Sequence, residues 1–443
     1  MPEVQSSQPS AGSSYQGATR QGSKALFQEW SQEVVHAKER GRSVAHCALA
    51  CHMPELLGAF DIVSIVYELN ATQLAAKKLA GKYISLAEDQ GYPLDSCSYG
   101  KCHVGLQQSG MEHPIFGKLP TPDMAIGATR CACHINLTEI SRSQYGIPSP
   151  ILDIPYNRVM QRATTEEEYQ ADKRYVLAQL EAIKEVCEKV TGKKFDPDKM
   201  SELIDRTDKG ALLYCRFVEL NRHRPAPYDM LLEGLNLMAI TNSPLRGTKL
   251  WLSVMENAVK EMEERVRLGT SPVPNEAFRL VFDGVPCYSQ MSTFTKLFHK
   301  WNAVFPYACY VSMVGGFGQW ETGFRGDPAR PLESLAEMLV ANRRPGMLDP
   351  YSDKLYHVLR GVEDYHCDGV VLHSVKSCRP ESTALADVRE ALMHDHHIPT
   401  VLLESDLVDA RYFSEAQMKQ RVDAFLESMG QRSERRRVKG AGR

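Results

Sequence analysis

The chain has 443 residues, of which 43% are hydrophobic and 24% are charged, and its formal net charge is −3. Both fractions lie near the globular average, so they exclude a disordered, collagen-like or coiled-coil protein, and the length predicts about two to three domains. The unusual feature is the number of cysteines, which is twelve. In a reducing cytosol, dispersed cysteines bind metals, take part in catalysis or pack as small hydrophobic residues more often than they form disulfides.

We expect a cytoplasmic protein with unstructured ends. The first 22 residues are rich in Ser, Gln and Gly and have no apolar run, which predicts a disordered tail rather than a signal peptide. Residues 430–443 contain six basic residues and one acidic residue, which predicts a solvated basic tail. The rest of the chain is acidic and has no nucleic-acid motif, so we expect no nucleic-acid partner. The uncharged stretch at 301–320 contains Pro306 and glycines, and we interpret it as buried strand and loop rather than a membrane span.

The first part of the chain begins with helical periodicity and then alternates between strands and helices. Leu26, Trp30 and Val34 recur at helical spacing and predict a helix at 24–41, inside an N-terminal helical segment at 23–60. A first α/β unit is predicted at 61–160. Its expected strands are 61–67, 123–129 and 149–155, and its expected helices are 71–87 and 135–145.

A helical connector and a second alternating unit complete the chain. Residues 161–275 contain long charged helical runs with almost no strand signal, and the second α/β unit is predicted at 276–429. Its expected strands are 278–286, 306–311, 369–373 and 399–403, and its expected helices are 293–303, 332–342, 352–362, 382–393 and 414–429. Such alternation implies parallel sheets covered by helices. The predicted fold class is therefore α/β, with two Rossmann- or flavodoxin-like parallel-sheet units.

Three cysteines fall where strands end and helices begin. Cys131 follows the strand expected at 123–129, Cys378 follows the strand expected at 369–373, and Cys97 opens another loop-to-helix junction. In open parallel sheets, ligands bind beyond the carboxyl ends of the strands, so these cysteines can converge between the two units. Three thiolates and one open position suit an iron–sulfur cluster.

Spacing alone leaves other interpretations open. The chain has no run of closely spaced cysteines of the ferredoxin type. The histidines at 394–397 are placed at a helix end, where an interaction with the helix dipole explains them better than metal binding does. The glycines at 315–318 lack the spacing of a nucleotide-binding loop. Five other cysteines are expected to be packing residues: Cys187, Cys215, Cys287, Cys309 and Cys367.

Several segments add a family resemblance that spacing could not supply. They include Pro-Glu-Leu within 51–60, Cys-Ser-Tyr at 97–99 and Asp-Ile-Pro at 153–155. Further segments lie at 368–380, 402–406 and 421–425. In order and spacing, these segments resemble the benzoyl-CoA reductase and 2-hydroxyacyl-CoA dehydratase family, and within it the B- or O-type subunits of the ATP-dependent reductase branch. The resemblance covers about residues 45–428.

The resemblance implies a [4Fe–4S] cluster held by Cys97, Cys131 and Cys378. Cys133 remains an alternative to Cys131. The family often has Pro-Glu-Glu-Leu where this chain has Pro-Glu-Leu. Three further cysteines have no evident place in the shared pattern, and their roles stay open: Cys47, Cys51 and Cys102.

The resemblance also implies a function and partners. It implies an iron–sulfur subunit that passes low-potential electrons to benzoyl-CoA or a substituted analogue. The implied partners are a homologous C- or N-type subunit, ATPase activator subunits and ferredoxin, and the absence of a P-loop in this sequence agrees with that division of labour. The alternatives are a 2-hydroxyacyl-CoA dehydratase subunit, a non-catalytic electron-relay or scaffold subunit, and a structural zinc site. The proton donor is unassigned, although five histidines lie near the cysteine segments: His46, His52, His103, His134 and His373.

Overall fold

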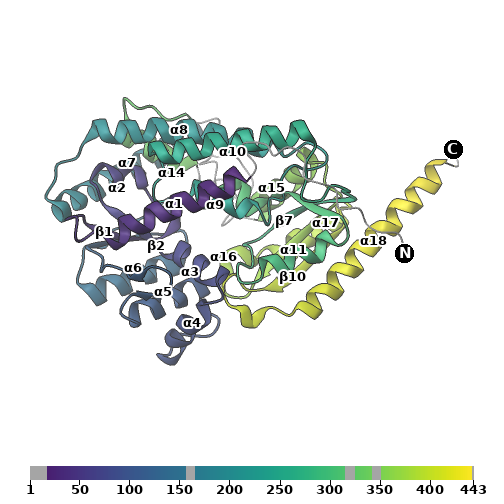
Figure 1. Cartoon of the computed structure of the whole chain (residues 1–443), viewed down its shortest axis with the longest axis horizontal. Helices are drawn as coiled ribbons and strands as arrows, with labels where there is room; N and C mark the ends of the chain where they lie inside the picture. Colours follow the sequence, from purple (N-terminus) through teal and green to yellow (C-terminus); the bar gives the residue numbers. More distant parts are fainter. Residues whose placement is uncertain (1–16, 156–164, 315–324, 342–350, 442–443) are drawn as a thin grey trace, which may run out of the picture.

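The computed structural model describes residues 17–155, 165–314, 325–341 and 351–441, and two four-stranded sheets dominate it (Figure 1). Residues 1–16 of the disordered tail expected at 1–22 lie outside the described residues. The glycines at 315–318 lie outside them as well. Both sheets are entirely parallel. The predicted α/β fold with two parallel-sheet units is confirmed.

The first sheet has the strand order β2, β1, β5, β6. These strands are β1 (Val44–Cys47), β2 (Val63–Val66), β5 (Met124–Ala128) and β6 (Ile151–Leu152). The elements around it are η1 (Leu49–Cys51), α2 (Pro54–Ala59), α3 (Tyr67–Ala76), α4 (Ala80–Asp89), α5 (Ser98–Gln108), the hairpin β3 (Glu112–His113) and β4 (Gly117–Lys118), and α6 (Ala132–Tyr145). Every residue of β1, β2 and β5 is buried, which explains their apolar composition, because parallel strands are covered on both faces.

The second sheet has the strand order β10, β9, β7, β8. These strands are β7 (Phe278–Asp283), β8 (Ala303–Ala308), β9 (Gly369–Val375) and β10 (Thr400–Ser405). The helices of this part are α11 (Met291–His299), α12 (Cys309–Val314), α14 (Pro331–Ala341), α15 (Tyr351–Asp364), α16 (Arg379–Ser382), α17 (Leu385–His394), η2 (Ala410–Tyr412) and α18 (Glu415–Ala441). The helix α18 packs on α11 and β10 and continues through most of the basic segment that we expected to be unstructured, and its end projects from the body (Figure 1).

Long helices link the two sheets. They are α7 (Glu166–Thr191), α8 (Pro197–Leu220), α9 (Gly234–Thr241) and α10 (Lys249–Leu268). The first of them begins with a capping box between Thr165 and Glu168 and ends at Gly192, whose φ of 69° suits glycine. The helices α1 (Ala18–Val35), α10 and α8 run side by side across the molecule (Figure 1).

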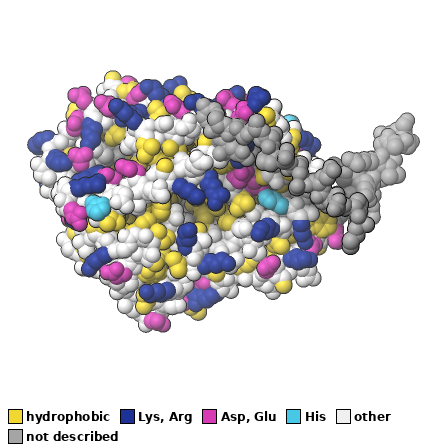
Figure 2. Space-filling model, viewed as in Figure 1, with side chains coloured by type: hydrophobic (Ala, Val, Ile, Leu, Met, Phe, Trp, Pro, Cys, Tyr) yellow, Lys and Arg dark blue, Asp and Glu magenta, His cyan; other side chains and the backbone are white. Residues whose placement is uncertain are grey.

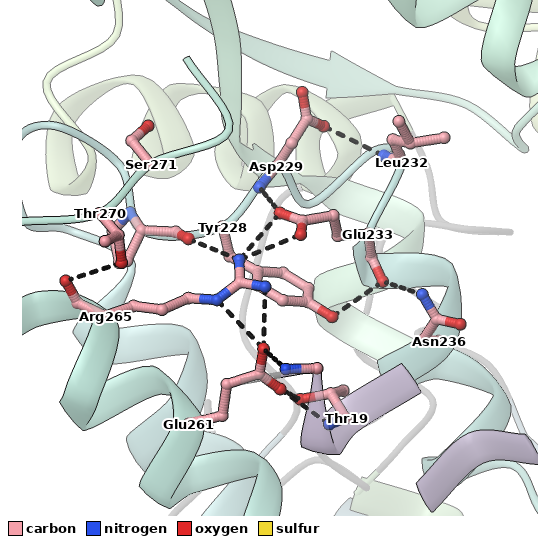
Figure 3. Close-up of polar contacts among 12 residues, drawn as sticks. Thr19, Tyr228, Asp229, Leu232, Glu233, Asn236, Glu261, Arg265, Thr270 and Ser271 are labelled. Carbon is pink, nitrogen blue, oxygen red and sulfur yellow. Dashed lines mark hydrogen bonds and ion pairs between the residues drawn. The ribbon is translucent and has the colours of Figure 1, made fainter. Parts of the chain in front are cut away.

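An arginine-centred network fixes the N-terminal helix to this layer (Figure 3). Arg265 of α10 lies 2.8 Å from Glu261 and 3.0 Å from Glu233, and its guanidinium lies 4.8 Å from the centre of the Tyr228 ring. Glu261 in turn accepts hydrogen bonds of 2.7 Å from both the backbone N–H and the hydroxyl of Thr19. Because the Glu261 carboxylate is buried, these bonds are what offset its removal from water.

Several local predictions differ from the structure. Residues 18–22 of the expected disordered tail are helical, and the strand expected at 306–311 is β8 at Ala303–Ala308, followed by α12. The strand β1 was not predicted, because Val44-Ala-His-Cys47 is short and includes a histidine. The helix expected at 71–87 is two helices, since Lys78 between them adopts a φ of 59°. The N-terminal helix begins at Ala18, six residues before the predicted start, and ends at Val35.

The visible face of the molecule mixes both signs of charge with hydrophobic side chains (Figure 2). On this face, lysine and arginine side chains alternate with aspartate and glutamate, and hydrophobic side chains lie between them. Among the residues that the structure describes, no helix is both long and apolar enough to cross a membrane.

A close helix contact provides a test of this packing. The helix α5 packs on α4, and a Cβ atom added at Gly105 would lie 1.9 Å from the carbonyl oxygen of Tyr83. We expect Gly105→Ala to lower the free energy of unfolding by about 3 kcal/mol or more, because a backbone atom must move. Gly81 on α4 is the matched control, since a Cβ there meets nothing within 4 Å. Gly81→Ala is expected to be neutral or stabilising by up to about 1 kcal/mol in urea unfolding. Equal effects at the two positions would contradict the packing.

Candidate functional site

One cavity of about 520 Å³ lies at the carboxyl ends of both sheets. Residues at or just beyond the ends of seven strands line it: Leu49 after β1, Glu68 after β2, Cys131 after β5, Asp283 of β7, Cys309 after β8, Cys378 after β9 and Leu407 after β10. Its size falls within the range of about 300–1,000 Å³ that is typical of small-molecule sites. The site therefore lies where parallel-sheet topology predicts it.

The three cysteines expected from strand ends all line this cavity. Cys97, Cys131 and Cys378 are the N-cap residues of α5, α6 and α16. The free backbone N–H groups and the positive end of a helix dipole favour negative charge at such positions. At Cys378, however, burial outweighs this effect and raises the pKa of the thiol.

A fourth thiol reaches the same place. Cys133 lines the cavity beside Cys97, and its S–H group, together with the backbone N–H groups at the start of α5, lowers the pKa of Cys97. The same pairing, together with burial, raises the pKa of Cys133. A Cβ atom at Gly100 would lie 2.8 Å from the Cys133 sulfur, so glycine at this position allows the close approach. Cys309, which we expected to be a packing residue, also lines the cavity wall.

This donor set fits an iron–sulfur cluster. Within the described parts of the chain, no group of three or more His, Cys, Asp or Glu side chains is arranged to hold a single metal ion. A cluster makes a different demand, because each thiolate binds a different iron and the sulfurs need not converge on one point. Several thiols around one cavity, three of them at helix N-termini, meet that demand.

A buried aspartate joins the loops that contain Cys97 and Cys378. Asp406 accepts a hydrogen bond of 2.6 Å from the hydroxyl of Ser98, which follows Cys97. It also accepts bonds of 2.5 Å and 3.0 Å from the hydroxyl and backbone N–H of Ser377, which precedes Cys378. The two serine hydroxyls lie 3.0 Å apart, and Asp406 is 1% exposed. One carboxylate therefore sets the separation of two loops, one between α4 and α5 and one between β9 and α16.

A charged pair lies on the other side of the cavity. His134 Nε2 is 2.7 Å from Glu68 Oε1, and both residues line the cavity. Burial opposes protonation of His134, but the Glu68 carboxylate and the nearby Cys131 thiol outweigh it and raise the pKa of His134 to about 10. At neutral pH this histidine is therefore a cation beside Cys131, where it stabilises negative charge on the sulfur.

A buried lysine adds a second positive charge to the wall. Lys354 of α15 lies 2.8 Å from Glu381 and 3.2 Å from Asp283, and its side chain is 2% exposed. Burial alone would lower the pKa of Lys354, but the two carboxylates outweigh it and raise the pKa. The ammonium group thus stays charged and links β7, α15 and the loop of Cys378.

The Pro-Glu-Leu segment has a structural role at the rim. Glu55 forms a bidentate ion pair with Arg246, with distances of 2.7 Å and 2.8 Å, and accepts a bond of 2.7 Å from Thr207. Arg246 also lines the cavity. His52, which lines the cavity as well, lies 2.8 Å from the Ser64 hydroxyl through Nε2. The segment therefore ties α2 and the start of α10 to the site.

The remaining residues considered in the sequence lie away from the cavity lining. Cys47, Cys51 and Cys102 are fully buried in hydrophobic clusters, so they pack rather than face the cavity. Cys187 and Cys287 are buried as expected. His373 hydrogen bonds to the Val285 carbonyl and the Ser405 hydroxyl, and His394 pairs with exposed Glu390.

Sequence reasoning missed several residues in the wall or behind it. Asp283 and Asp406 end or follow strands, so the rule that selected the cysteines also applies to them. Glu68 lies in the first turn of α3, directly after a strand that ends at Val66, and is within reach of the same rule. Lys354 gave no such signal, because it lies within a helical stretch of ordinary polar composition.

Comparison with known proteins gives a consistent result. Residues 51–429 match the family model described as 2-hydroxyglutaryl-CoA dehydratase, D-component. The chain is 29% identical to a benzoyl-CoA reductase subunit of Thauera aromatica, over 90% of this chain and 91% of that protein. It is 27% identical to the (R)-phenyllactyl-CoA dehydratase alpha subunit of Clostridium sporogenes, over 89% and 92% of the two chains. It is 26% identical to the lactoyl-CoA dehydratase alpha subunit of Anaerotignum propionicum, over 91% and 95%.

The Asp406 contacts provide a test of how the loops are held. We expect Asp406→Ala to lower the free energy of unfolding by about 3 kcal/mol or more, because it leaves several buried donors without an acceptor. Iron bound per folded chain after anaerobic purification is also expected to fall, since the loops of Cys97 and Cys378 lose their common anchor. Asp406→Asn keeps one carbonyl oxygen, so its stability and its iron content should lie between those of the wild type and those of Asp406→Ala.

The control uses a neighbouring pair on the same loops. Asp95 and Arg379 also join them, at 2.9 Å, but both side chains are exposed. Asp95→Ala should change stability by less than about 1 kcal/mol and leave the iron content unchanged. Loss of iron from Asp95→Ala and not from Asp406→Ala would show that the buried contacts do not position the site.

Proposed function

The chain belongs to the 2-hydroxyglutaryl-CoA dehydratase D-component family, and from this premise we propose that it is the iron–sulfur subunit of an ATP-dependent benzoyl-CoA reductase. The observation that supports this most is the convergence of Cys97, Cys131 and Cys378 on one cavity from both sheets. We propose these three as the protein ligands of a [4Fe–4S] cluster. Cys133 is a further thiol of the same wall.

The proposed reaction adds two electrons and two protons to the ring of benzoyl-CoA, or a substituted analogue, and gives a cyclohexadiene-carbonyl-CoA. A bound cluster supplies low-potential single electrons. Such electrons require a site that excludes water, and the chain itself contributes apolar walls to it. Four apolar side chains contribute to these walls: Leu137, Ile140, Met338 and Leu339.

Two positively charged side chains lie in the wall, where carboxylates balance or exceed their charge. The His134 cation beside Cys131 and the charged Lys354 are both held by carboxylates that keep their side chains in place. A radical anion of the ring develops negative charge, and fixed positive groups stabilise it without reorganisation. We assign these two residues an electrostatic role in the proposed reaction.

The partners follow from the same proposal. A homologous C- or N-type subunit would complete the cluster-bearing heterodimer, ATPase activator subunits would drive electrons into it, and ferredoxin would supply them, all in the cytoplasm. The two α/β units predicted at 61–160 and 276–429 would be joined by the connector at 161–275, and the first unit also includes β1 at Val44–Cys47. The relatives' names support a subunit role, because each of them is called a subunit.

A 2-hydroxyacyl-CoA dehydratase subunit is the second candidate. The family model and the phenyllactyl-CoA and lactoyl-CoA relatives favour it. In that reaction the electron is recycled and water leaves the acyl chain. A third candidate, a non-catalytic relay or scaffold subunit, would leave the acyl-CoA in contact with the partner subunit alone.

An anaerobic assay separates these candidates. The complex is incubated with reduced activator, ATP and benzoyl-CoA, and in parallel with 2-hydroxyacyl-CoA thioesters. We expect a diene product and ATP hydrolysis that depends on benzoyl-CoA. Formation of an enoyl-CoA from a 2-hydroxyacyl-CoA, without diene, would reject the reductase in favour of the dehydratase.

The ligand assignment is tested by single substitutions. We expect Cys97→Ala, Cys131→Ala and Cys378→Ala each to lower iron and acid-labile sulfide to less than about half of the wild-type content, because each removes a proposed ligand. Cys187→Ala is the control, since Cys187 is fully buried in a hydrophobic cluster. Iron that stays constant in Cys131→Ala and falls in Cys133→Ala would transfer the ligand role to Cys133. Zinc in place of iron and sulfide would reject the cluster.

A further inference from the structure

The strand β1 and the helices α3 and α5 contain a group of buried polar side chains that the proposed function does not yet use. We call His46 of β1, Asn70 of α3, and His103 and Gln107 of α5 the buried polar cluster. Each of them is at most 3% exposed. Both ring nitrogens of His46 and His103, both amide atoms of Asn70 and Oε1 of Gln107 find no hydrogen-bond partner among the described residues.

These side chains lie together rather than scattered. The ring centres of His46 and His103 are 5.2 Å apart, and the Tyr67 ring lies 4.3 Å from His103 and 5.9 Å from His46. Asn70 lies one turn after Tyr67 on α3, and Gln107 lies one turn after His103 on α5, so each pair shares a helix face. The helices α3 and α5 pack on each other.

The chemistry of these groups calls for water. Burial lowers the pKa of His46 to about 3, and burial with the neighbouring His46 lowers the pKa of His103, so both rings are neutral. A neutral imidazole has one donor and one acceptor nitrogen, and buried polar groups in native proteins are nearly always paired. Several unpaired donors and acceptors facing one another offer the two to four partners that an ordered water molecule needs.

A polar stripe on α6 runs from the cavity, past the buried polar cluster, to the surface. His134, Ser141 and Tyr145 are spaced by seven and four residues and therefore lie on one face, over a rise of about 16 Å. His134 lines the cavity, and Tyr145 at the far end is half-buried. Gln107 Nε2 donates to the Ser141 hydroxyl at 3.2 Å, and the Tyr145 side chain interacts with Gln107.

We propose that ordered water fills the buried polar cluster and that the hydrated cluster delivers protons from the surface at Tyr145 to the cavity wall beside Glu68. This rests on the proposed reductase function, in which each ring takes up two electrons from the external low-potential donor and two protons. A neutral imidazole that accepts a proton at one nitrogen and releases one from the other regains its charge but exchanges its tautomer, so the ring must turn over before it carries the next proton. Every proton delivered is replaced from solvent at Tyr145.

His103→Leu tests the route in the complete complex with activator, ATP and benzoyl-CoA. The substitution keeps a similar volume and removes both nitrogens. We expect the rate of diene formation to fall at least about tenfold, with unchanged iron content and unchanged KM for benzoyl-CoA, because only proton supply is affected. The ratio of ATP hydrolysed to diene formed should rise, and the solvent deuterium isotope effect on kcat should increase. His103→Gln, which keeps a polar side chain, should recover part of the rate.

The matched control is His113→Leu. His113 is 2% exposed but stacks on Phe116 at the β3–β4 hairpin, outside the cluster. This variant should match the wild type in rate, ATP ratio and isotope effect. An unchanged rate and isotope effect in His103→Leu, or equal losses in both variants, would overturn the route.

A second readout does not depend on activity. A high-resolution crystal structure of the purified complex should show water within about 3.2 Å of ring nitrogens of His46 and His103. A dry cluster in a complex that forms diene would reject the route and leave the reductase function intact. Water in a complex that forms no diene would reject the reductase function and establish the hydration alone.

Discussion

The site depends on one buried carboxylate that is shared between two loops distant in the sequence. Asp406 has 1% exposure and accepts bonds from Ser98 and Ser377, which adjoin Cys97 and Cys378, and from the backbone N–H groups of its own loop. A charge taken out of water is tolerated only when its oxygens are fully hydrogen-bonded. Because the buried Asp406 carboxylate needs all of these hydrogen bonds, the two loops must keep the separation that allows them.

Parallel topology explains why so many different residues reach one cavity. In both sheets every strand points the same way, so the loops that follow the strands collect at one edge. Helices begin directly after several of these loops, and their free N–H groups face the cysteines. The cations His134 and Lys354 are each held by carboxylates, so the cavity combines an apolar wall with fixed positive groups.

The sequence predicted the architecture where local and global signals agree. The strands β5, β7, β9 and β10 are apolar runs with polar boundaries. The strand-end rule selected Cys131 and Cys378, and a loop-to-helix junction selected Cys97, before any contact was known. Prediction from the sequence failed where a residue's role depends on contacts with elements that are distant in the sequence. The bend at Lys78 has no glycine or proline to mark it, and Lys354 takes its function from carboxylates on two other elements. Cys309 was interpreted as a packing residue because exposure to an internal cavity leaves no periodic signal.

Two histidines on inner strands show why residue type alone does not identify a functional group. His373 on β9 and His46 on β1 are both fully buried in parallel sheets. Both nitrogens of His373 are bonded within the protein, so its burial is balanced and its role is structural. Neither nitrogen of His46 is bonded among the described residues, and its neighbour His103 is in the same position. A core under selection only for stability would replace such a pair with apolar side chains of similar volume, because that removes the cost of unpaired polar atoms. Proton exchange with ordered water therefore explains two adjacent neutral imidazoles beside a polar helix stripe better than packing does.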